Sequence, residues 1–160
     1  MNVRHPSEKV MSWEAARIWR GSIPGRVVFT NGVFDLLHPG HVDVIAGARA
    51  RGDALVVGVN SDASVARLKG PDRPVRGEHD RAYVLASLEA VDAVAIFDEQ
   101  TPLELIRVLR PDVLAKGGDY SPETIVGRRD VEGWGGEVVV IPLTPGQSTT
   151  SIIERMRGTV

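Results

Sequence analysis

The stretch TNGVFDLLHPGH at residues 30–41 places His38 and His41 on either side of a Pro-Gly pair. Pro39 is typical of the first turn of a helix, so both histidines are expected at a helix N-terminus. Unpartnered backbone N–H groups and a partial positive charge make that end of a helix attractive to anions. Two imidazoles can donate further hydrogen bonds to phosphate oxygens, and Gly40 leaves space for a phosphate to approach. The pattern predicts a phosphate site, which accounts for two histidines better than helix capping does.

Two later clusters have similar chemistry. The segment KGGDY at residues 116–120 brings a lysine and bare backbone together, although a glycine turn with a capping aspartate is the alternative interpretation. The segment STTS at residues 148–151 supplies four hydroxyl groups in succession at the expected start of the last helix. One hydroxyl is enough for a helix cap, so four favour a second helix N-terminus directed at phosphate.

Three basic residues near these clusters are further candidates. Lys69 is either a clamp on phosphates or a solvated loop lysine, and Arg73 lies in the same polar segment. Arg81 is a weaker candidate, because it could instead pair with Glu78 or Asp80 at the surface.

Asp35 stands beside the first predicted helix after the TNG triplet. There it is expected to interact with the helix dipole and to accept hydrogen bonds from backbone N–H groups. Contact with substrate or metal is the second interpretation.

The elements that must position these clusters alternate between strand and helix along most of the chain. Apolar runs rich in β-branched residues predict five strands, at residues 27–29, 54–59, 93–97, 113–115 and 138–141. Helical spacing and terminal Gly or Pro predict helices at residues 12–19, 39–51, 78–90, 102–110, 121–134 and 148–156. Residues 61–77 are expected to form a long polar connection.

This alternation predicts a Rossmann-like α/β fold, a doubly wound five-stranded parallel sheet with helices on both faces. Ligands of such sheets bind outside the carboxyl ends of the strands, where the strand order reverses. The unusual residues do follow predicted strands, at residues 30–41, 60–62, 116–120 and 144–151. The sequence therefore predicts a single site along one edge of the sheet.

Composition limits the class of protein. The chain has 160 residues, of which 42% are hydrophobic and 25% charged, as expected for one globular domain. The 19 basic residues against 21 acidic ones argue against a protein that coats nucleic acid. The chain has no cysteine, which excludes disulfides, thiolate zinc sites and cysteine nucleophiles.

The N-terminal residues and the apolar runs indicate where the protein acts. No run is long enough to span a membrane, and the first residues lack the apolar core of a signal peptide. The expected location is therefore the cytoplasm, with no membrane partner. Residues 1–25 are expected to form an N-terminal extension with a short helix, and residues 26–160 the main domain.

Together the motifs resemble those of the cytidylyltransferase-like nucleotidyltransferase superfamily. HPGH is similar to its HxGH signature and QSTTS to its second signature, with Arg155 as a candidate for the arginine that often follows. The segments VGVNSDASVARLKGPDRPV, DRAYVLASLEAVDAVAIFDE and PDVLAKGGDYSPETIVG resemble the adenylyltransferases of ADP-heptose biosynthesis. The resemblance covers roughly residues 26–157, and several motifs in the right order are more specific than HxGH alone.

This resemblance implies transfer of AMP from ATP to D-glycero-D-manno-heptose 1-phosphate, with in-line attack on the α-phosphate and release of pyrophosphate. It implies that Mg²⁺ arrives with ATP and that the protein supplies no assigned metal ligand, and a homodimer or larger homo-oligomer is expected. The implied catalytic residues are His38, His41 and Lys69. The implied nucleotide-binding residues are Thr30, Asn31, Gly32, Val33, Phe34, Gly40, Lys116, Gly117, Asp119, Gly146, Ser148, Thr149, Thr150 and Ser151. The implied sugar-phosphate-binding residues are Asp35, Asn60, Asp62, Arg81 and Tyr120.

Two other functions stay open at this point. One is a cytidylyltransferase that uses glycerol 3-phosphate or another alcohol phosphate. The other belongs to a different class, a non-catalytic module that senses ATP, although a sensor would not need His38, His41 and Lys69 as phosphate donors. A dehydrogenase is not indicated, because no G-x-G-x-x-G follows the first predicted strand.

Overall fold

The computed structural model describes residues 3–158 and folds them around a five-stranded, all-parallel sheet. Its strands are β1 (Val27–Gly32), β2 (Ala54–Asn60), β3 (Ala93–Phe97), β4 (Val113–Gly117) and β5 (Glu137–Ile141). Their order is β3-β2-β1-β4-β5, so the chain winds outward from β1 to β3 and then returns to add β4 on the other side of β1. The order reverses between β1 and β4, which confirms the predicted doubly wound α/β fold.

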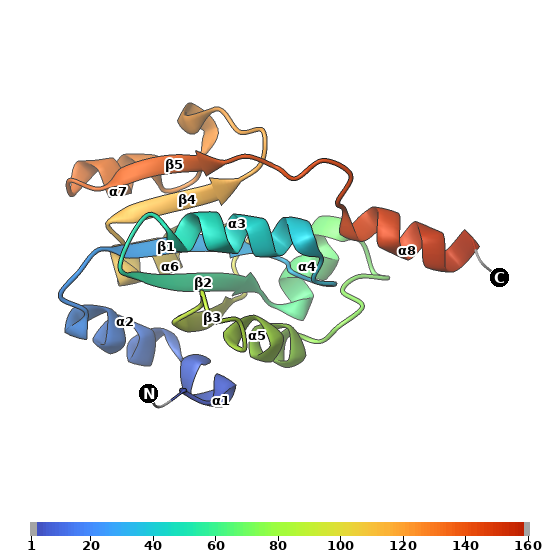
Figure 1. The fold of residues 1–160 in the computed structure, drawn as a ribbon, viewed down its shortest axis with the longest axis horizontal. Coiled ribbons are helices and arrows are strands. Elements are labelled where there is room, and N and C mark those ends of the chain that lie inside the picture. The colour runs from blue at the N-terminus through green and yellow to red at the C-terminus, as the bar shows by residue number, and fades with distance from the viewer. Residues whose placement is uncertain (1–2, 159–160) are drawn as a thin grey trace.

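Helices cover both faces of the sheet, as predicted (Figure 1). One face packs against α3 (Pro39–Arg49) and α5 (Glu78–Ala86), and the other against α2 (Trp13–Ser22), α6 (Leu103–Leu109) and α7 (Arg128–Gly133). Side chains of each strand point alternately to the two faces, so the strands are covered on both sides. Val28 and Leu55 face α3 and α5, whereas Val27 and Phe29 face the other layer.

The predicted strands are all present, and three of them continue further toward the ligand edge than predicted, β2 by one residue to Asn60. β1 runs on to Gly32 and β4 to Gly117. Asn31 and Gly32 therefore stand in a strand, paired with Gly58 and Val59 of β2. The ladder of hydrogen bonds holds this part of the chain in place beside the site.

Two predictions about connecting segments were wrong. The polar connection at residues 61–77 contains a helix, α4 (Asp62–Lys69), which Ser61 caps by accepting a hydrogen bond from the backbone N–H of Ser64. The predicted helix at residues 121–134 is broken at Gly127, whose φ of +88° a helix does not tolerate. A 3₁₀ turn, η1 (Pro122–Thr124), precedes this break and α7 follows it.

The N-terminal segment packs against the sheet. It contains a helix that was not predicted, α1 (Pro6–Lys9), followed by α2, which continues past Gly21 to Ser22. The predicted ranges 1–25 and 26–160 include residues 1–2 and 159–160, which lie outside the described residues. Ala16 of α2 is completely buried and belongs to the same core cluster as β1, so residues 3–25 share the core of the main domain.

The last helix, α8 (Thr149–Gly158), does not contribute a buried residue to the core. None of its described residues is buried, and it projects beyond the carboxyl ends of the strands (Figure 1). Only its first turn is therefore positioned to contribute to a site at that edge. Among residues 3–158, no helix has the length and apolar character that a membrane span needs.

Candidate active site

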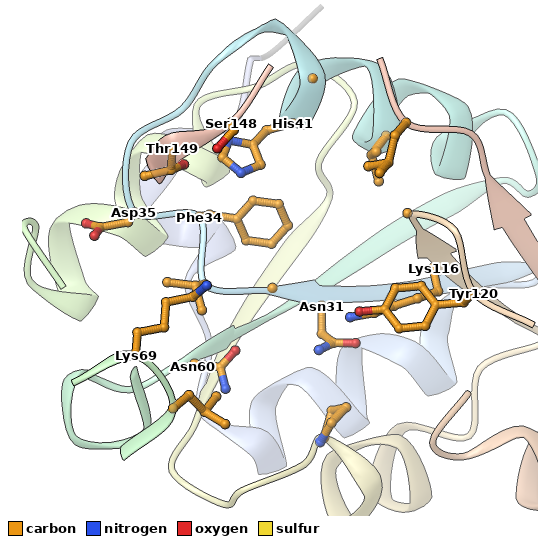
Figure 2. A pocket seen from close by; sticks show the side chains of 18 of the residues that line it. Asn31, Phe34, Asp35, His41, Asn60, Lys69, Lys116, Tyr120, Ser148 and Thr149 are labelled. Carbon is orange, nitrogen blue, oxygen red and sulfur yellow. The ribbon is translucent and has the colours of Figure 1, made fainter. Parts of the chain in front are cut away.

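A cavity of about 590 Å³ opens at the carboxyl ends of the strands, where the strand order reverses. This volume lies within the range of small-molecule sites, and the position is the one expected for a doubly wound sheet. Figure 2 shows His41, Ser148 and Thr149 on one side of it, Lys69 and Asn60 on another, and Lys116 with Tyr120 on a third. The predicted clusters from distant parts of the sequence thus meet around one space.

The turn between β1 and α3 forms the wall that holds both histidines. Its backbone passes through Phe34, whose φ of +50° is unusual for a residue other than glycine. Phe34 is buried, and its ring meets His41 edge-on with 5.3 Å between the ring centroids. The strained turn is therefore fixed by the packing of its own aromatic side chain against the histidine.

His38 and His41 stack on one another at the start of α3. Their ring centroids are 3.8 Å apart, and the backbone N–H of His38 donates to Nδ1 of His41 at 3.3 Å. Because Nδ1 of His41 accepts this bond, the proton of the neutral ring belongs on Nε2. Each histidine therefore depends on the other for its orientation.

Burial keeps both imidazoles neutral. Desolvation, followed by the proximity of His38, lowers the pKa of His41 from 6.5 to about 4, and burial also lowers the pKa of His38. At neutral pH the Nε2–H of His41 can donate to an oxyanion without carrying a full charge. Within the described part of the chain, Nδ1 of His38 is buried and has no hydrogen-bond partner.

Gly40 has a packing role that was not predicted. A Cβ at this position would lie 2.9 Å from Cε1 of His38 and 3.0 Å from Cβ of Gln147. The missing side chain therefore makes room for the histidine ring and for the segment that leads into α8. Gly40 also lines the cavity, and that it leaves space for a phosphate stays a prediction.

Asp35 accepts backbone hydrogen bonds, as predicted, but from a distant segment rather than from α3. It is 3% exposed and accepts from the N–H groups of Val75 and Arg76 and from Nε of Arg73, all within 2.9 Å. It thus fixes the connection between α4 and α5 to the β1 turn. Both of its oxygens are occupied by these donors, so a direct contact with the sugar phosphate is not supported.

Lys69 and Arg81 were predicted from the same polar region, and the structure separates them. Lys69 is the last residue of α4, not part of a loop, and its exposed side chain lines the cavity. Arg81 is 1% exposed and donates to the carbonyl oxygens of Arg76, Val33 and Asn60 and to Oδ1 of Asp62, each at 2.8 Å. The alternative of a surface pairing was therefore wrong, and the predicted contact of Arg81 with the sugar phosphate is not supported, because Arg81 joins the β1–α3 turn, β2 and α4 to α5 from within.

The end of β4 supplies the opposite wall. Lys116 is half-buried, burial lowers its pKa, and its Nζ lies 5.6 Å from the ring centroid of Tyr120. A Cβ on Gly117 would lie 2.7 Å from Val44, so the glycine lets α3 pack closely on β4. Tyr120 therefore stands beside Lys116, across the cavity from Asn60, with which it had been grouped as a sugar-phosphate contact (Figure 2).

The start of α8 closes the cavity over the histidines. Thr149 donates through Oγ1 to the carbonyl oxygen of Leu36 at 3.2 Å, which attaches the helix to the β1–α3 turn. Ser148 accepts from the backbone N–H of Ser151, as a helix cap does. The hydroxyl run therefore combines capping with lining of the cavity, through Ser148, Thr149 and Thr150.

Most of the predicted site residues line the cavity. These are Asn31, Gly32, Val33, Phe34, Asp35, His38, Gly40, His41, Asn60, Lys69, Lys116, Gly117, Tyr120, Ser148, Thr149 and Thr150. The predicted residues that do not line it are Thr30, Asp62, Arg81, Asp119, Gly146 and Ser151. Thr30 is buried inside β1, and Asp119, Gly146 and Ser151 are exposed outside the cavity.

Residues after β3 were missed in the sequence analysis. Gln100, Thr101 and Pro102 line the cavity, although no cluster had been recognised there. The signal was present in the sequence, because the carboxyl end of the third parallel strand must reach the same edge as the others. Further lining residues that were missed or ranked low are Val44, Leu68, Arg73, Leu114, Thr124, Ile125, Val126, Leu143, Thr144 and Gln147.

Comparison with known proteins agrees with this geometry. The sequence profile of the family described as Cytidylyltransferase-like matches residues 29–155. The chain belongs to this family. The resemblance found in its motifs is thereby confirmed, and the protein is a nucleotidyltransferase of the cytidylyltransferase-like family.

Two relatives within the family are bacterial proteins named Bifunctional protein HldE. That of Syntrophotalea carbinolica is 62% identical over 130 residues, which cover 81% of this chain and 26% of the relative. That of Acidiphilium cryptum is 58% identical over 145 residues, which cover 91% of this chain and 30% of the relative. The chain thus spans less than a third of the length of these relatives.

Solved structures show the same fold. A lipopolysaccharide core biosynthesis protein from Thermoplasma volcanium superposes with a TM-score of 0.61 at 26% identity, over 75% of this chain and 97% of that one. A pantoate-beta-alanine ligase from Francisella tularensis gives a TM-score of 0.60 over 92% of this chain and 76% of that one. Because the identity is 14%, the second comparison shows a shared fold and nothing more.

Proposed function

We propose that this domain transfers AMP from ATP to D-glycero-D-manno-heptose 1-phosphate and releases pyrophosphate. The observation that carries the proposal is the meeting of two neutral imidazoles, the N-terminus of α8 and separate basic groups around one cavity. The choice of heptose phosphate is supported by the 62% and 58% identity to proteins named HldE and by the motifs that resemble ADP-heptose adenylyltransferases.

The reaction needs two phosphates to meet. An oxygen of the sugar phosphate attacks the α-phosphorus of ATP, a new P–O bond forms, and the bond to pyrophosphate breaks in line. The attacking oxygen is already anionic near neutral pH, so no protein base has to remove a proton from it. The remaining task for the protein is to hold both substrates and to stabilise charge on the α-phosphate oxygens.

The histidine pair fits this task. In the proposed reaction, Nε2–H of His41 donates to an α-phosphate oxygen, and His38 supplies a second imidazole from the same turn. Their lowered pKa values agree with the role of donor rather than of general acid, because a neutral ring has little tendency to release its proton. The start of α8, with Ser148 and Thr149, adds hydroxyl and backbone donors to the triphosphate.

We assign the other two walls of the cavity to different substrates, one to the nucleotide and one to the sugar phosphate. Lys116 and Tyr120 lie beside apolar lining from Leu114 and Ile125, a surface suited to the nucleoside and its phosphates. Asn60 and Lys69 lie on a different side of the cavity, which we assign to the sugar phosphate (Figure 2). Tyr120 thereby moves from the sugar-phosphate group to the nucleotide group of the proposal.

A magnesium ion fits this proposal as a companion of ATP. Within residues 3–158, no group of three or more histidine or carboxylate side chains is placed to hold a metal ion. Asp35, the one carboxylate among the described lining residues, already accepts from Arg73, Val75 and Arg76. When bound, the ion would neutralise phosphate charge and be held by phosphate and water oxygens.

We place the reaction in the cytoplasm, where ATP is available.

A panel of substrates tests the proposal. The protein is incubated with ATP, CTP, GTP or UTP and with heptose 1-phosphate, other sugar 1-phosphates or glycerol 3-phosphate, while pyrophosphate and nucleotide product are measured. We expect ADP-heptose and pyrophosphate in equal amounts. Activity with CTP and glycerol phosphate alone would contradict the proposal, and ATP binding without any product would indicate a sensing module.

A further inference from the structure

Asp35 fixes the connection between α4 and α5, residues 70–77, in one position. Its side chain is 1% exposed, and it accepts from the backbone N–H groups of Val75 and Arg76 and from Nε of Arg73. Although burial alone would raise it, these hydrogen bonds hold the pKa of Asp35 below its usual range. If this connection moved away, a buried carboxylate would lose its partners, so the connection is held in place.

Arg73 is the side chain of this connection that faces the cavity. Its side chain is 13% exposed, and it lines the cavity. Only its Nε–H is used, by Asp35 at 2.8 Å; its two terminal amino groups have no hydrogen-bond partner among residues 3–158. A guanidinium that is held at one nitrogen and open at the other two matches the paired oxygens of a phosphate.

The neighbouring basic residues differ from Arg73 in one respect each. Lys69 also lines the cavity, but its side chain is exposed and makes no hydrogen bond or ion pair with the described residues 3–158. Arg76 is held by the same carboxylate through its backbone, but its side chain is exposed and does not line the cavity. Arg73 is thus the basic group of this wall that is both held in place and directed at the ligand space.

The position of this wall indicates which phosphate it serves. The histidines and the start of α8 provide one group of phosphate donors, and Figure 2 shows Asp35 and Lys69 away from Lys116 and Tyr120. Two phosphate-bearing substrates need two anion sites. The acceptor phosphate must also approach the negatively charged triphosphate, and a cation on its side reduces their repulsion.

We propose that Arg73 binds the phosphate group of the acceptor substrate and that Asp35 is the positioning residue that holds Arg73 for this task. The inference rests on the proposed function, because it assigns a residue to the second substrate of that reaction. It gives Asp35 an indirect role in place of a contact with the sugar phosphate.

Kinetics of matched variants test the inference. Arg73→Ala is expected to raise KM for heptose 1-phosphate by about 10- to 100-fold, the effect of losing a charged hydrogen-bonding partner, with KM for ATP nearly unchanged. Arg76→Ala removes the same charge from the same connection and is expected to leave both constants as in the wild type. Arg73→Lys should recover part of the affinity, because it restores the charge but not the paired donors.

Asp35→Asn distinguishes a role of Asp35 in positioning Arg73 from a role in stability alone. We expect it to raise KM for heptose 1-phosphate in the same direction as Arg73→Ala but less, while a purely structural role would reduce the folded fraction and leave both KM values of the folded enzyme unchanged. Equal KM values for Arg73→Ala and Arg76→Ala would overturn the inference, and so would a rise confined to ATP, which would assign Arg73 to the triphosphate. In both cases the proposed function stands, whereas wild-type protein that makes no ADP-heptose refutes that function itself.

Discussion

The β1–α3 turn, residues 30–41, and the N-terminal segment, residues 3–25, are used in opposite ways. The turn lies at the carboxyl ends of the strands, and its two histidines line a cavity. The N-terminal segment lies along the outer strand of the sheet, and its polar groups are used by the protein itself. Val10 forms a parallel bridge with Val94 of β3, and Met11 donates its backbone N–H to the same residue at 2.8 Å.

Side chains of the N-terminal segment complete this attachment. Trp13 donates through Nε1 to the carbonyl oxygen of Ile96 at 2.8 Å, and Lys9 donates through Nζ to the carbonyl oxygen of Val91 at 2.8 Å. An edge strand left open would expose unpaired backbone groups, and the segment covers them. The contrast teaches that donors directed at the protein contribute to stability, whereas side chains that line a cavity, such as the imidazoles of His38 and His41, are within reach of a ligand.

The largest expected effect is on turnover, from His41→Ala in the turn. We expect kcat to fall by about 100- to 1,000-fold, because one donor to the developing charge is lost. The free energy of unfolding should fall by only about 1–2 kcal/mol, because Phe34 and His38 lose the ring against which they pack and the backbone N–H of His38 loses its acceptor. Pyrophosphate release and urea unfolding measure the two quantities.

A matched control uses a histidine away from the cavity. His79 of α5 is 87% exposed, so His79→Ala should leave turnover and stability near the wild-type values. If His41→Ala kept wild-type turnover, or lost it only through unfolding, the assignment of the turn to catalysis would be wrong.

The turn could be predicted from sequence because its chemistry restricts its residues. Neither core packing nor helix capping requires two histidines around Pro-Gly after a strand, and the order of the strands then places Lys116 and Ser148 at the same edge. Contacts between distant segments could not be predicted in this way. That Asp35 accepts from Val75 and Arg76 depends on the path of a connection whose sequence carries no recognisable motif.

The contacts of the N-terminal segment with the sheet could not be predicted from sequence either. Its sequence predicted a short helix but not the backbone pairing with β3, because a bridge such as that of Val10 with Val94 leaves no motif. The same reason applies to α4, which was missed: only Ser64 and Val65 of that helix are buried, so its apolar periodicity is weak. A homo-oligomer stays a prediction.

The next largest effect is on stability, from Trp13→Ala in the N-terminal segment. Trp13 is partly buried against the core and donates a hydrogen bond to β3, so we expect a loss of about 2–3 kcal/mol in the free energy of unfolding. The folded fraction should keep wild-type kcat and both KM values, the reverse of the result for His41→Ala. Ile18→Ala on the same helix, at a position 61% exposed, is the control and should change stability by less than about 0.5 kcal/mol. A large loss of kcat in folded Trp13→Ala protein would mean that the two regions are not separate in function.

The smallest expected effect is on the pH dependence of the free energy of unfolding, and it comes from His41 in the turn. His41 has a pKa of about 4 when folded, against 6.5 as its ordinary value. Between these pH values the unfolded chain binds a proton that the folded chain does not, so stability from this residue is present above pH 6.5 and is lost as pH falls toward 4. One histidine can change the free energy of unfolding by at most about 1.4 kcal/mol per pH unit.

His41→Gln isolates this contribution, because the amide does not titrate and still offers an N–H donor. Urea unfolding at pH 6.5 and at one unit below should show a smaller loss of stability for the variant than for the wild type. Burial lowers the pKa of His38 as well, so His38→Gln should flatten the curve in the same direction. Parallel curves for wild type and His41→Gln would show that the ring takes up its proton as easily in the folded protein as in the unfolded chain. The ring of His41 would then be charged at mildly acidic pH, and the contrast with the donors of the N-terminal segment would rest on that charge rather than on a neutral hydrogen bond.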